Sequence, residues 1–180
     1  MQANTKTTTK TQHILQAMQI LSWIAFIGLL IEVGAILFSY IVSLINPEAT
    51  GKLYKLTDLS HLRELSFTYY TISVSFILAL AAMKAYIAYL LIKVLTKVNL
   101  ADPFQMKVAL LLEKISHILL GAFVVSLLNS LNVDQTFKDT GVQLEEWPTG
   151  EFIFIAGIVY IFSQIFKRGV EIQSEHDLTV

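Results

Sequence analysis

The chain has 180 residues, of which 54% are hydrophobic and only 15% are charged, whereas about 25% of the residues in an average soluble domain are charged. Its formal net charge is −1, which gives no sign of direct nucleic-acid binding. The absence of cysteine excludes disulfides, thiolate metal sites and cysteine nucleophiles. This composition predicts an integral membrane protein with a single domain, which crosses the cell membrane several times.

Four stretches that are poor in charged residues predict four membrane-spanning helices, because a helix needs about 20 mostly apolar residues to cross a bilayer. The last stretch is the shortest, since its charge-free run holds only the 15 residues from Phe152 to Phe166. Residues 1–12 contain the run TKTTTKT, which predicts disorder, and residues 168–180 are expected to form a cytoplasmic tail. We therefore predict an all-α, four-helix membrane bundle with spans near 18–46, 67–95, 109–131 and 148–167.

The distribution of lysine and arginine predicts that both termini lie in the cytoplasm, where short loops of membrane proteins carry an excess of these residues. Eight of them fall in the N-terminal segment, the 93–114 connection and the C-terminal tail, against four in the loops on the other side. The first of those outer loops ends in DLSHLRELSF, whose apolar spacing is typical of a helix. This helix is expected to extend the second span outward or to lie on the outer leaflet.

Two charged residues fall inside the predicted spans. Glu32 lies near the middle of the first span, on a face where small and polar residues recur every three or four positions, as on helices that pack inside membrane bundles. Lys84 lies in the second span, again with small residues nearby. Sequential spans are antiparallel neighbours, and the two residues lie at similar depths. We therefore predict that Glu32 and Lys84 face the bundle interior as an intramembrane charge pair.

Three interpretations of this charge pair stay open at the level of the sequence. In the first, the pair is structural and fixes the register of the helices, which is one use of buried ion pairs. In the second, it exchanges protons or binds a ligand. In the third, Lys84 extends alone toward the membrane surface while Glu32 stays protonated.

No motif in the sequence indicates catalysis or a bound cofactor. The nucleotide-binding, G-x-S-x-G and H-E-x-x-H patterns are all missing. Glu113 and His117 lie one helical turn apart at the start of the third span, but a metal site needs more ligands than two. We therefore expect a non-enzymatic protein that holds neither a metal nor a cofactor.

Two short runs of residues resemble a known family. The C-terminal run FKRGVEIQSEHDLTV resembles the signature of a bacterial membrane family described only as domain of unknown function 2975. The run Asp102–Pro103–Phe104 resembles that family's Asn-Pro-Phe box, with Asp102 where Asn is commoner. The resemblance implies four spans, no established activity and genomic neighbours that encode small helix-turn-helix regulators. It further implies a cytoplasmic interaction surface formed by Asp102, Pro103, Phe104, Arg168, Gly169, Glu171, Glu175 and Asp177.

The residues of this surface also carry local structural expectations. Pro103 disfavours helical geometry at Asp102, so Asp102 is expected to cap the third helix through its side chain. Gly169 is expected to let the tail bend back toward that cap, and Arg168 to pair with Asp102 or Glu171. These contacts would either form a docking surface or only close one end of the bundle.

The sequence favours a membrane sensor or accessory protein that holds a cytoplasmic regulator through the 93–114 connection and the tail. The alternative is a small homodimeric transporter that uses Glu32, since four-helix drug exporters also use one intramembrane glutamate. A Glu32–Lys84 pair would neutralise the carboxylate that proton exchange needs, which weighs against this alternative. The ligand, the oligomeric state and the identity of the partner do not follow from the sequence.

Overall fold

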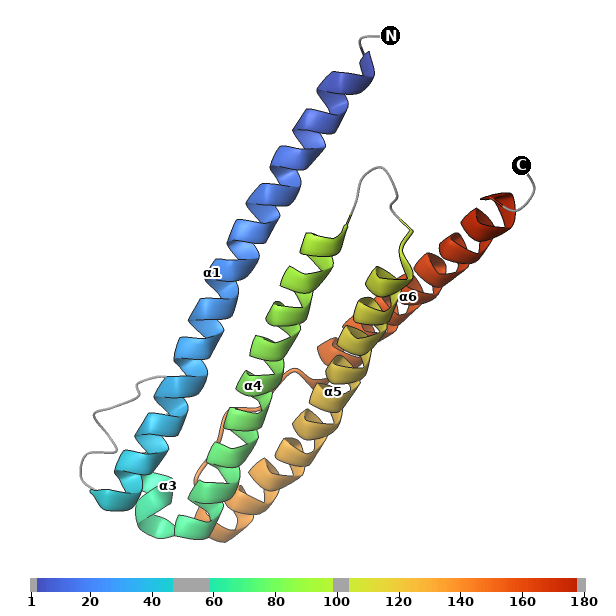
Figure 1. The fold of residues 1–180 in the computed structure, drawn as a ribbon. Coiled ribbons are helices and arrows are strands. Elements are labelled where there is room, and N and C mark those ends of the chain that lie inside the picture. Colours follow the sequence, from blue (N-terminus) through green and yellow to red (C-terminus); the bar gives the residue numbers. More distant parts are fainter. Residues whose placement is uncertain (1–2, 47–58, 99–103, 178–180) are drawn as a thin grey trace.

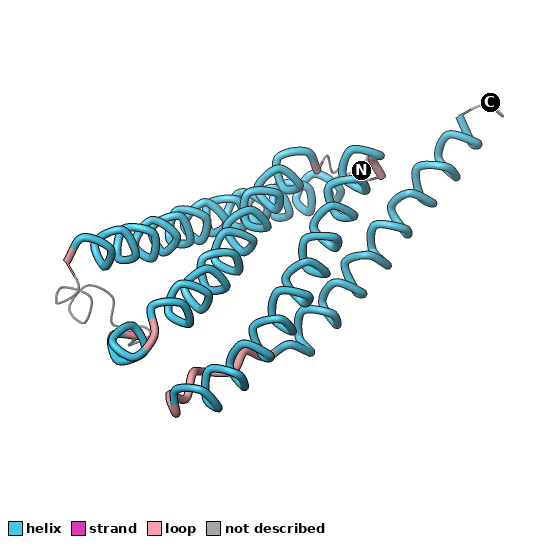
Figure 2. The backbone as a smooth tube through the Cα atoms, turned by 90° about the horizontal axis from the view of Figure 1, so that it is seen from below, coloured by secondary structure: helices cyan, strands magenta, loops and turns pink. Residues whose placement is uncertain are grey.

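The computed structural model describes residues 3–46, 59–98 and 104–177, and for residues 3–11, 176 and 177 it describes the backbone alone. Within these ranges there is no strand, and short loops join the helices (Figure 2). The helices are α1 (Ala3–Ile45), α3 (Ser60–Leu65), α4 (Phe67–Lys97), α5 (Met106–Thr140) and α6 (Thr149–Asp177) (Figure 1).

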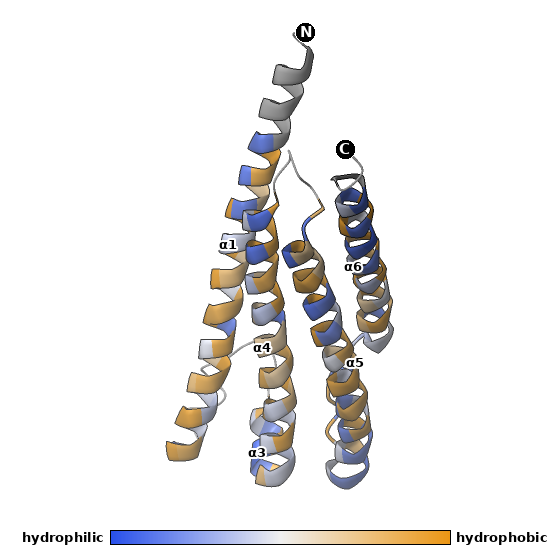
Figure 3. Cartoon of the chain, turned by 45° about the vertical axis from the view of Figure 1, so that its right-hand side comes forward, coloured by the Kyte–Doolittle hydropathy of each residue, from blue (hydrophilic) through white to orange (hydrophobic). Residues whose placement is uncertain are grey.

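Four of these helices, α1, α4, α5 and α6, are long and apolar enough to cross a membrane, which confirms the predicted fold class. Many large apolar side chains of α1 and α6 are exposed, as expected for helices that face lipid. Figure 3 shows hydrophobic residues along much of the four long helices, with hydrophilic residues gathering toward the C-terminal end of α6. The fold does not tell which side of the membrane each end occupies, so the cytoplasmic termini stay a prediction.

Helix α4 packs against α1 on one side and α5 on the other, and α5 packs against α6. The short helix α3 packs on α4. Small side chains of α4, those of Ala81, Ala85 and Ala88, are buried, which lets neighbouring helices approach closely. On the other side, the hydroxyl of Ser116 in α5 donates a hydrogen bond of 2.9 Å to the carbonyl oxygen of Ala156 in α6. Inside a membrane, an apolar helix surface gains little from leaving lipid for another helix, because both are apolar. A hydrogen bond of this kind therefore helps to hold the two helices together.

The apolar core has two parts, one toward each end of the bundle. One cluster lies at the end that holds α3 and joins α1, α3 and α4, with Leu62 fully buried. The other joins α4, α5 and α6 nearer the opposite end, around Leu90 and Val108. The first cluster borders the cavity that is described in the next subsection.

Helix α3 is a separate element and not an extension of α4. The chain breaks at Ser66, whose extended backbone caps α4 and whose hydroxyl accepts a hydrogen bond from the N–H of Tyr69. Arg63 in α3 donates a hydrogen bond to the backbone carbonyl of Ser43 in α1. The hydroxyl of Tyr70 also donates to the hydroxyl of Ser43, at 3.0 Å. These bonds hold the end of α1 against α3 and α4.

The connection between α5 and α6 turns back into the bundle. Gly141 ends α5 with a φ of 71°, in the left-handed region that glycine adopts without strain. Residues 141–148 then run without helix beside α4, and Val142 and Leu144 pack against the core cluster at the α3 end. As a result, α6 begins part-way along α5 instead of at its end (Figure 1).

At the N-terminus the structure differs from the prediction. We expected residues 1–12 to be disordered, but α1 is helical from Ala3 onward. The polar threonines and lysines of this segment follow directly on an apolar helix, and a helix that has already formed extends at little cost per residue. The prediction of disorder was therefore wrong from Ala3 on, and residues 1–2 lie outside the described part of the chain.

The orientation can be tested with single cysteines, because the natural chain has none. Glu64 in α3 and Ser174 in α6 are exposed at opposite ends of the bundle (Figure 1). In intact cells, a membrane-impermeant maleimide should label Glu64→Cys, and it should label Ser174→Cys only after permeabilisation. Labelling in the reverse pattern would mean that both termini lie outside the cytoplasm.

Candidate binding cavity and interaction surface

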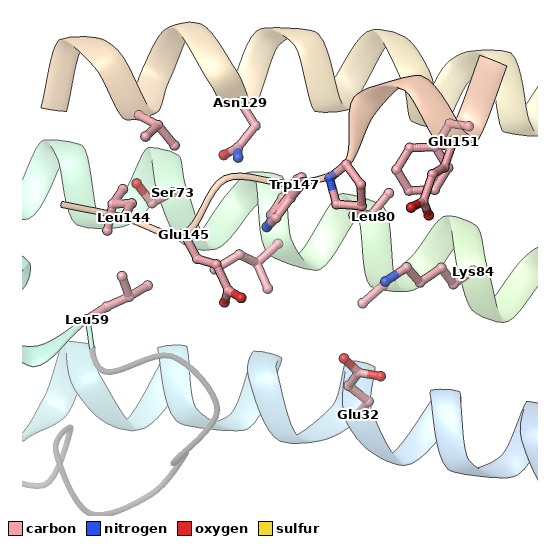
Figure 4. A pocket seen from close by; sticks show the side chains of 15 residues that line it. Glu32, Leu59, Ser73, Leu80, Lys84, Asn129, Leu144, Glu145, Trp147 and Glu151 are labelled. Carbon is pink, nitrogen blue, oxygen red and sulfur yellow. The ribbon is translucent and has the colours of Figure 1, made fainter. Parts of the chain in front are cut away.

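A cavity of about 370 Å³ lies between α1, α4, α5 and the connection 141–148, toward the end that holds α3. Figure 4 shows the irregular connection passing between the long helices along one wall of this cavity. The apolar part of the wall comes from α3, α4, α5, the connection and the start of α6, through Leu59, Ile77, Leu80, Ala81, Val133, Leu144, Pro148 and Phe152.

Glu32 and Lys84 both line this cavity, so the two charges predicted to share a site do lie around one space. Glu32 is half-buried and Lys84 is exposed to the cavity. In Figure 4 the side chain of Lys84 extends between Glu32 on α1 and Glu151 on α6. Among the described residues neither Glu32 nor Lys84 has an ion-pair partner within 4.0 Å. Direct pairing of Glu32 with Lys84 therefore stays a prediction.

Four polar groups of the cavity were missed by the sequence reasoning: Asn129, Glu145, Trp147 and Glu151. Glu145 and Glu146 precede the fourth predicted span and Glu151 lies at its start, and nothing in the local pattern shows that this segment folds back. Two signals were available in the sequence. The fourth apolar run is short for a span, and Trp147–Pro148 is an unusual pair of residues for a solvated acidic loop.

Asn129 differs from the other polar groups of the cavity because it is buried. Its side chain is 4% exposed, and its amide points toward the cavity in Figure 4. Within the described chain this amide has no hydrogen-bond partner. By contrast, the neighbouring hydroxyl of Ser73 accepts a hydrogen bond of 3.0 Å from Asn132. Since its amide atoms are not among the buried atoms that lack a partner, they stay accessible from the cavity and can donate and accept hydrogen bonds there.

The cavity does not have the geometry of a metal centre. Among the described residues, no three His, Asp or Glu side chains lie close enough together to hold one metal ion. The carboxylates of Glu32, Glu145 and Glu151 come from α1, the connection and α6, respectively, and surround an open space. This arrangement suits a larger ligand that touches several groups at once.

A second hollow, of about 510 Å³, lies at the opposite end of the bundle, where α6 passes the start of α5. Three residues of the predicted interaction surface, Phe104, Arg168 and Gly169, line this hollow. The ring of Phe104 packs edge-on against Phe166, with 5.6 Å between the ring centres. The structure thus brings together residues that are more than 60 positions apart in the sequence.

The role of Gly169 differs from the predicted one. We expected a bend in the tail at this position, but α6 continues as a helix to Asp177. Gly169 instead leaves room for Phe104, because a Cβ atom here would lie 2.6 Å from Cγ of that ring. The glycine is therefore required by the close approach of a ring to the helix backbone and not by a turn.

The predicted cap of α5 is also wrong. The helix begins at Met106 and its N-cap residue is Gln105, whose side chain makes no capping hydrogen bond. A cap at Asp102 would need the helix to begin three residues earlier. Asp102 and Pro103 themselves lie outside the described residues.

The charges of the predicted surface make contacts along α6. Arg168 pairs with Glu171 at 2.7 Å, one of the two partners that we predicted for it. Glu175 is exposed further along the same helix, and only the backbone of Asp177 is described. Lys167 pairs with Glu113 of α5 at 2.8 Å, in a half-buried ion pair that the sequence did not suggest.

Replacing Gly169 should separate its structural role from that of an ordinary helical glycine. Gly169→Ala should lower the free energy of unfolding by about 1–3 kcal/mol, as overpacking does, whereas Gly157→Ala should leave it unchanged or raise it by up to about 1 kcal/mol. Gly157 is the matched control, since it lies in the same helix and a Cβ there meets no atom within 4 Å. The measurement is thermal unfolding of the purified protein in detergent.

A second variant checks the cause of that loss. Phe104→Ala removes the ring, so adding Gly169→Ala to it should have no further destabilising effect. If Gly169→Ala is equally harmful with and without the ring, the contact between Phe104 and Gly169 does not determine the stability.

Three comparisons with known proteins bear on this chain. The family model described as "Protein of unknown function (DUF2975)" matches residues 55–180. No curated protein matches the chain, and no solved structure does. The match to the family model does not test the two short motifs on which the resemblance was based.

Proposed function

The chain belongs to the family of domain of unknown function 2975, and we propose that this multi-pass protein is a non-enzymatic ligand sensor located in the cell membrane. It binds a ligand in the cavity at the α3 end and holds a cytoplasmic regulator at the other end. The observation that carries this proposal is the cavity itself, in which four charged side chains and a buried amide have no partners among the described residues. Lys84, Glu145 and Glu151 are exposed and Glu32 is half-buried, so these groups are reachable by a ligand that enters the cavity.

A physical connection runs from the cavity to the opposite end of the bundle. Glu145 and Trp147 line the cavity and lie only a few residues before α6 begins. Helix α6 then packs along α5 through the hydrogen bond from Ser116 to Ala156 and the ion pair between Lys167 and Glu113. A ligand that moves the connection therefore also moves α6 relative to α5.

The opposite end offers a surface that fits a protein partner. Ile172 is 46% exposed beside the hollow, next to the pair of Arg168 and Glu171. An apolar anchor surrounded by charged groups is the usual composition of a protein-binding patch. The family resemblance suggests a small helix-turn-helix regulator as the partner.

The regulator should bind to this hollow and not to the helix surface in general. Ile172→Glu places a charge in the hollow and should reduce co-purification of a co-expressed helix-turn-helix regulator at least tenfold. Ser174→Glu is the matched control, because Ser174 is exposed on the same helix but does not line the hollow. Deleting residues 171–180 should abolish capture of the regulator. If the truncated protein is folded and still holds the regulator, this part of the proposal fails.

One observation favours a second function, that of a homodimeric transporter. Glu32 lies within a helix long and apolar enough to span a membrane and has no ion-pair partner within 4.0 Å among the described residues, so its carboxylate is available for proton exchange. Proton uptake into liposomes in response to an outward gradient of a cationic dye would support this function if Glu32→Gln abolishes it. A lack of dye-driven proton flux in the wild type would leave the sensor as the better account.

A further inference from the structure

The charged groups of the cavity are unequal in sign. Glu32, Glu145 and Glu151 contribute three carboxylates, and Lys84 contributes the single ammonium group. None of the four has a partner in the described chain. Glu32 is half-buried and the other three are exposed, so solvent screens them in part, but the space still carries a surplus of negative charge. The cavity therefore favours an occupant that carries positive charge.

That occupant is larger than a metal ion. The carboxylates are spread over three elements and do not gather into a group that could hold one metal. The volume of about 370 Å³ is within the range of small-molecule pockets. A cation that reaches more than one carboxylate across this space must therefore be an organic one.

The walls specify the rest of such a molecule. Leu80, Val133 and Phe152 provide apolar surface, which suits a hydrocarbon or aromatic body. The indole of Trp147 also lines the cavity, near Glu145 (Figure 4), and an aromatic face beside a carboxylate is a favourable place for an ammonium group. The amide of Asn129 can accept one hydrogen bond from an N–H group and donate others.

We propose that this cavity is a binding site for an organic ammonium ion with an apolar body. Its ammonium group lies between Glu145, Glu151 and Trp147, its N–H groups reach Asn129, and its body lies on the apolar wall. This inference rests on the proposed sensor function, and it adds the chemical class of the ligand that the sensor would detect. Lys84 repels the ligand's charge and so keeps the affinity moderate, which a sensor needs in order to release its ligand.

Binding can be followed through Trp147 itself. The chain has two tryptophans, and Trp23 is 45% exposed and lies outside the cavity, so Trp23→Phe leaves Trp147 as the sole reporter. The protein is placed in nanodiscs of phosphatidylglycerol and titrated with 2-phenylethylammonium. The tryptophan emission should change in a saturable manner. The neutral 3-phenylpropan-1-ol should bind at least tenfold more weakly, and the anionic 3-phenylpropionate should not bind.

Charge variants of the cavity test the site with a matched control. Glu145→Gln and Glu151→Gln should each weaken binding of 2-phenylethylammonium about tenfold, the usual loss for one charge-assisted bond. Glu146→Gln should not weaken it, because Glu146 is exposed on the same connection but does not line the cavity. Lys84→Gln should strengthen binding, and a gain in affinity cannot result from partial unfolding.

Three outcomes would overturn the proposal. They are equal binding of the neutral and the cationic probe, equal effects of Glu145→Gln and Glu146→Gln, and weaker binding in Lys84→Gln. The last would mean that Lys84 supports the binding site instead of repelling the cationic probe, which has no anionic group. The proposed function is tested separately, because loss of regulator capture in Ile172→Glu does not depend on which ligand the cavity takes.

The ammonium group has two sources, a soluble amine or the headgroup of phosphatidylethanolamine. Repeating the titration in nanodiscs that contain phosphatidylethanolamine distinguishes them. If this lipid raises the apparent Kd of 2-phenylethylammonium, the lipid headgroup enters the cavity. If the Kd is unchanged, the ligand is a soluble amine, and both results agree with an ammonium site.

Discussion

Backbone polar groups inside a membrane must be hydrogen-bonded, so backbone that is not helical is tolerated there only where it is buried in protein or lines a cavity. Residues 141–148 are not helical, and four of them, Leu144, Glu145, Trp147 and Pro148, line the cavity. They run beside the spanning part of α4, anchored by Val142 and Leu144 at one end and followed by α6 at the other. The shape of the cavity and the positions of the Glu145 and Glu151 carboxylates depend on this connection. So does the point part-way along α5 at which α6 begins.

The family match covers only some of the residues that line the cavity. The matched range begins at residue 55 and so includes α4, α5, the connection and α6. It therefore includes Lys84, Asn129, Glu145 and Glu151, whereas Glu32 on α1 lies before it. The extensive contacts of α1 are with α4. An ammonium site centred on Glu145 and Glu151 is thus built from the matched part of the chain.

The sequence was sufficient for the class of the fold because long charge-poor runs have few alternatives to a membrane helix. It also placed Glu32 and Lys84 correctly around one space, since small residues beside each of them indicated an inward face. It gave only indirect signs of the return of residues 141–148, such as the short fourth apolar run, because an irregular segment has no periodicity that a pattern could detect. Asn129 was missed for the same reason, since its importance comes from a wall that the connection forms.

Two expectations from local rules were corrected near the second hollow. Gly169 was interpreted as a flexible point, and Asp102 as a cap, because local rules assign glycine to bends and Asp to caps. In the structure, the ring of Phe104 occupies the space that a Cβ of Gly169 would fill, and the helix begins after Gln105. A contact between distant segments decided the role of Gly169, and no local rule contains it.

The burial of Ala156 gives α6 the mechanics of a lever. This residue is 1% exposed and its carbonyl oxygen is tied to Ser116 of α5, which makes it a natural pivot. At 1.5 Å per residue, the arm from the pivot to Thr149 is about 10 Å long and the arm to Asp177 about 31 Å. Lys167 ties the long arm to Glu113 of α5, so a displacement at the cavity would be enlarged about threefold at the far end once this ion pair opens. The ring of Phe104 touches the long arm, so small movements beside the connection would reach it amplified.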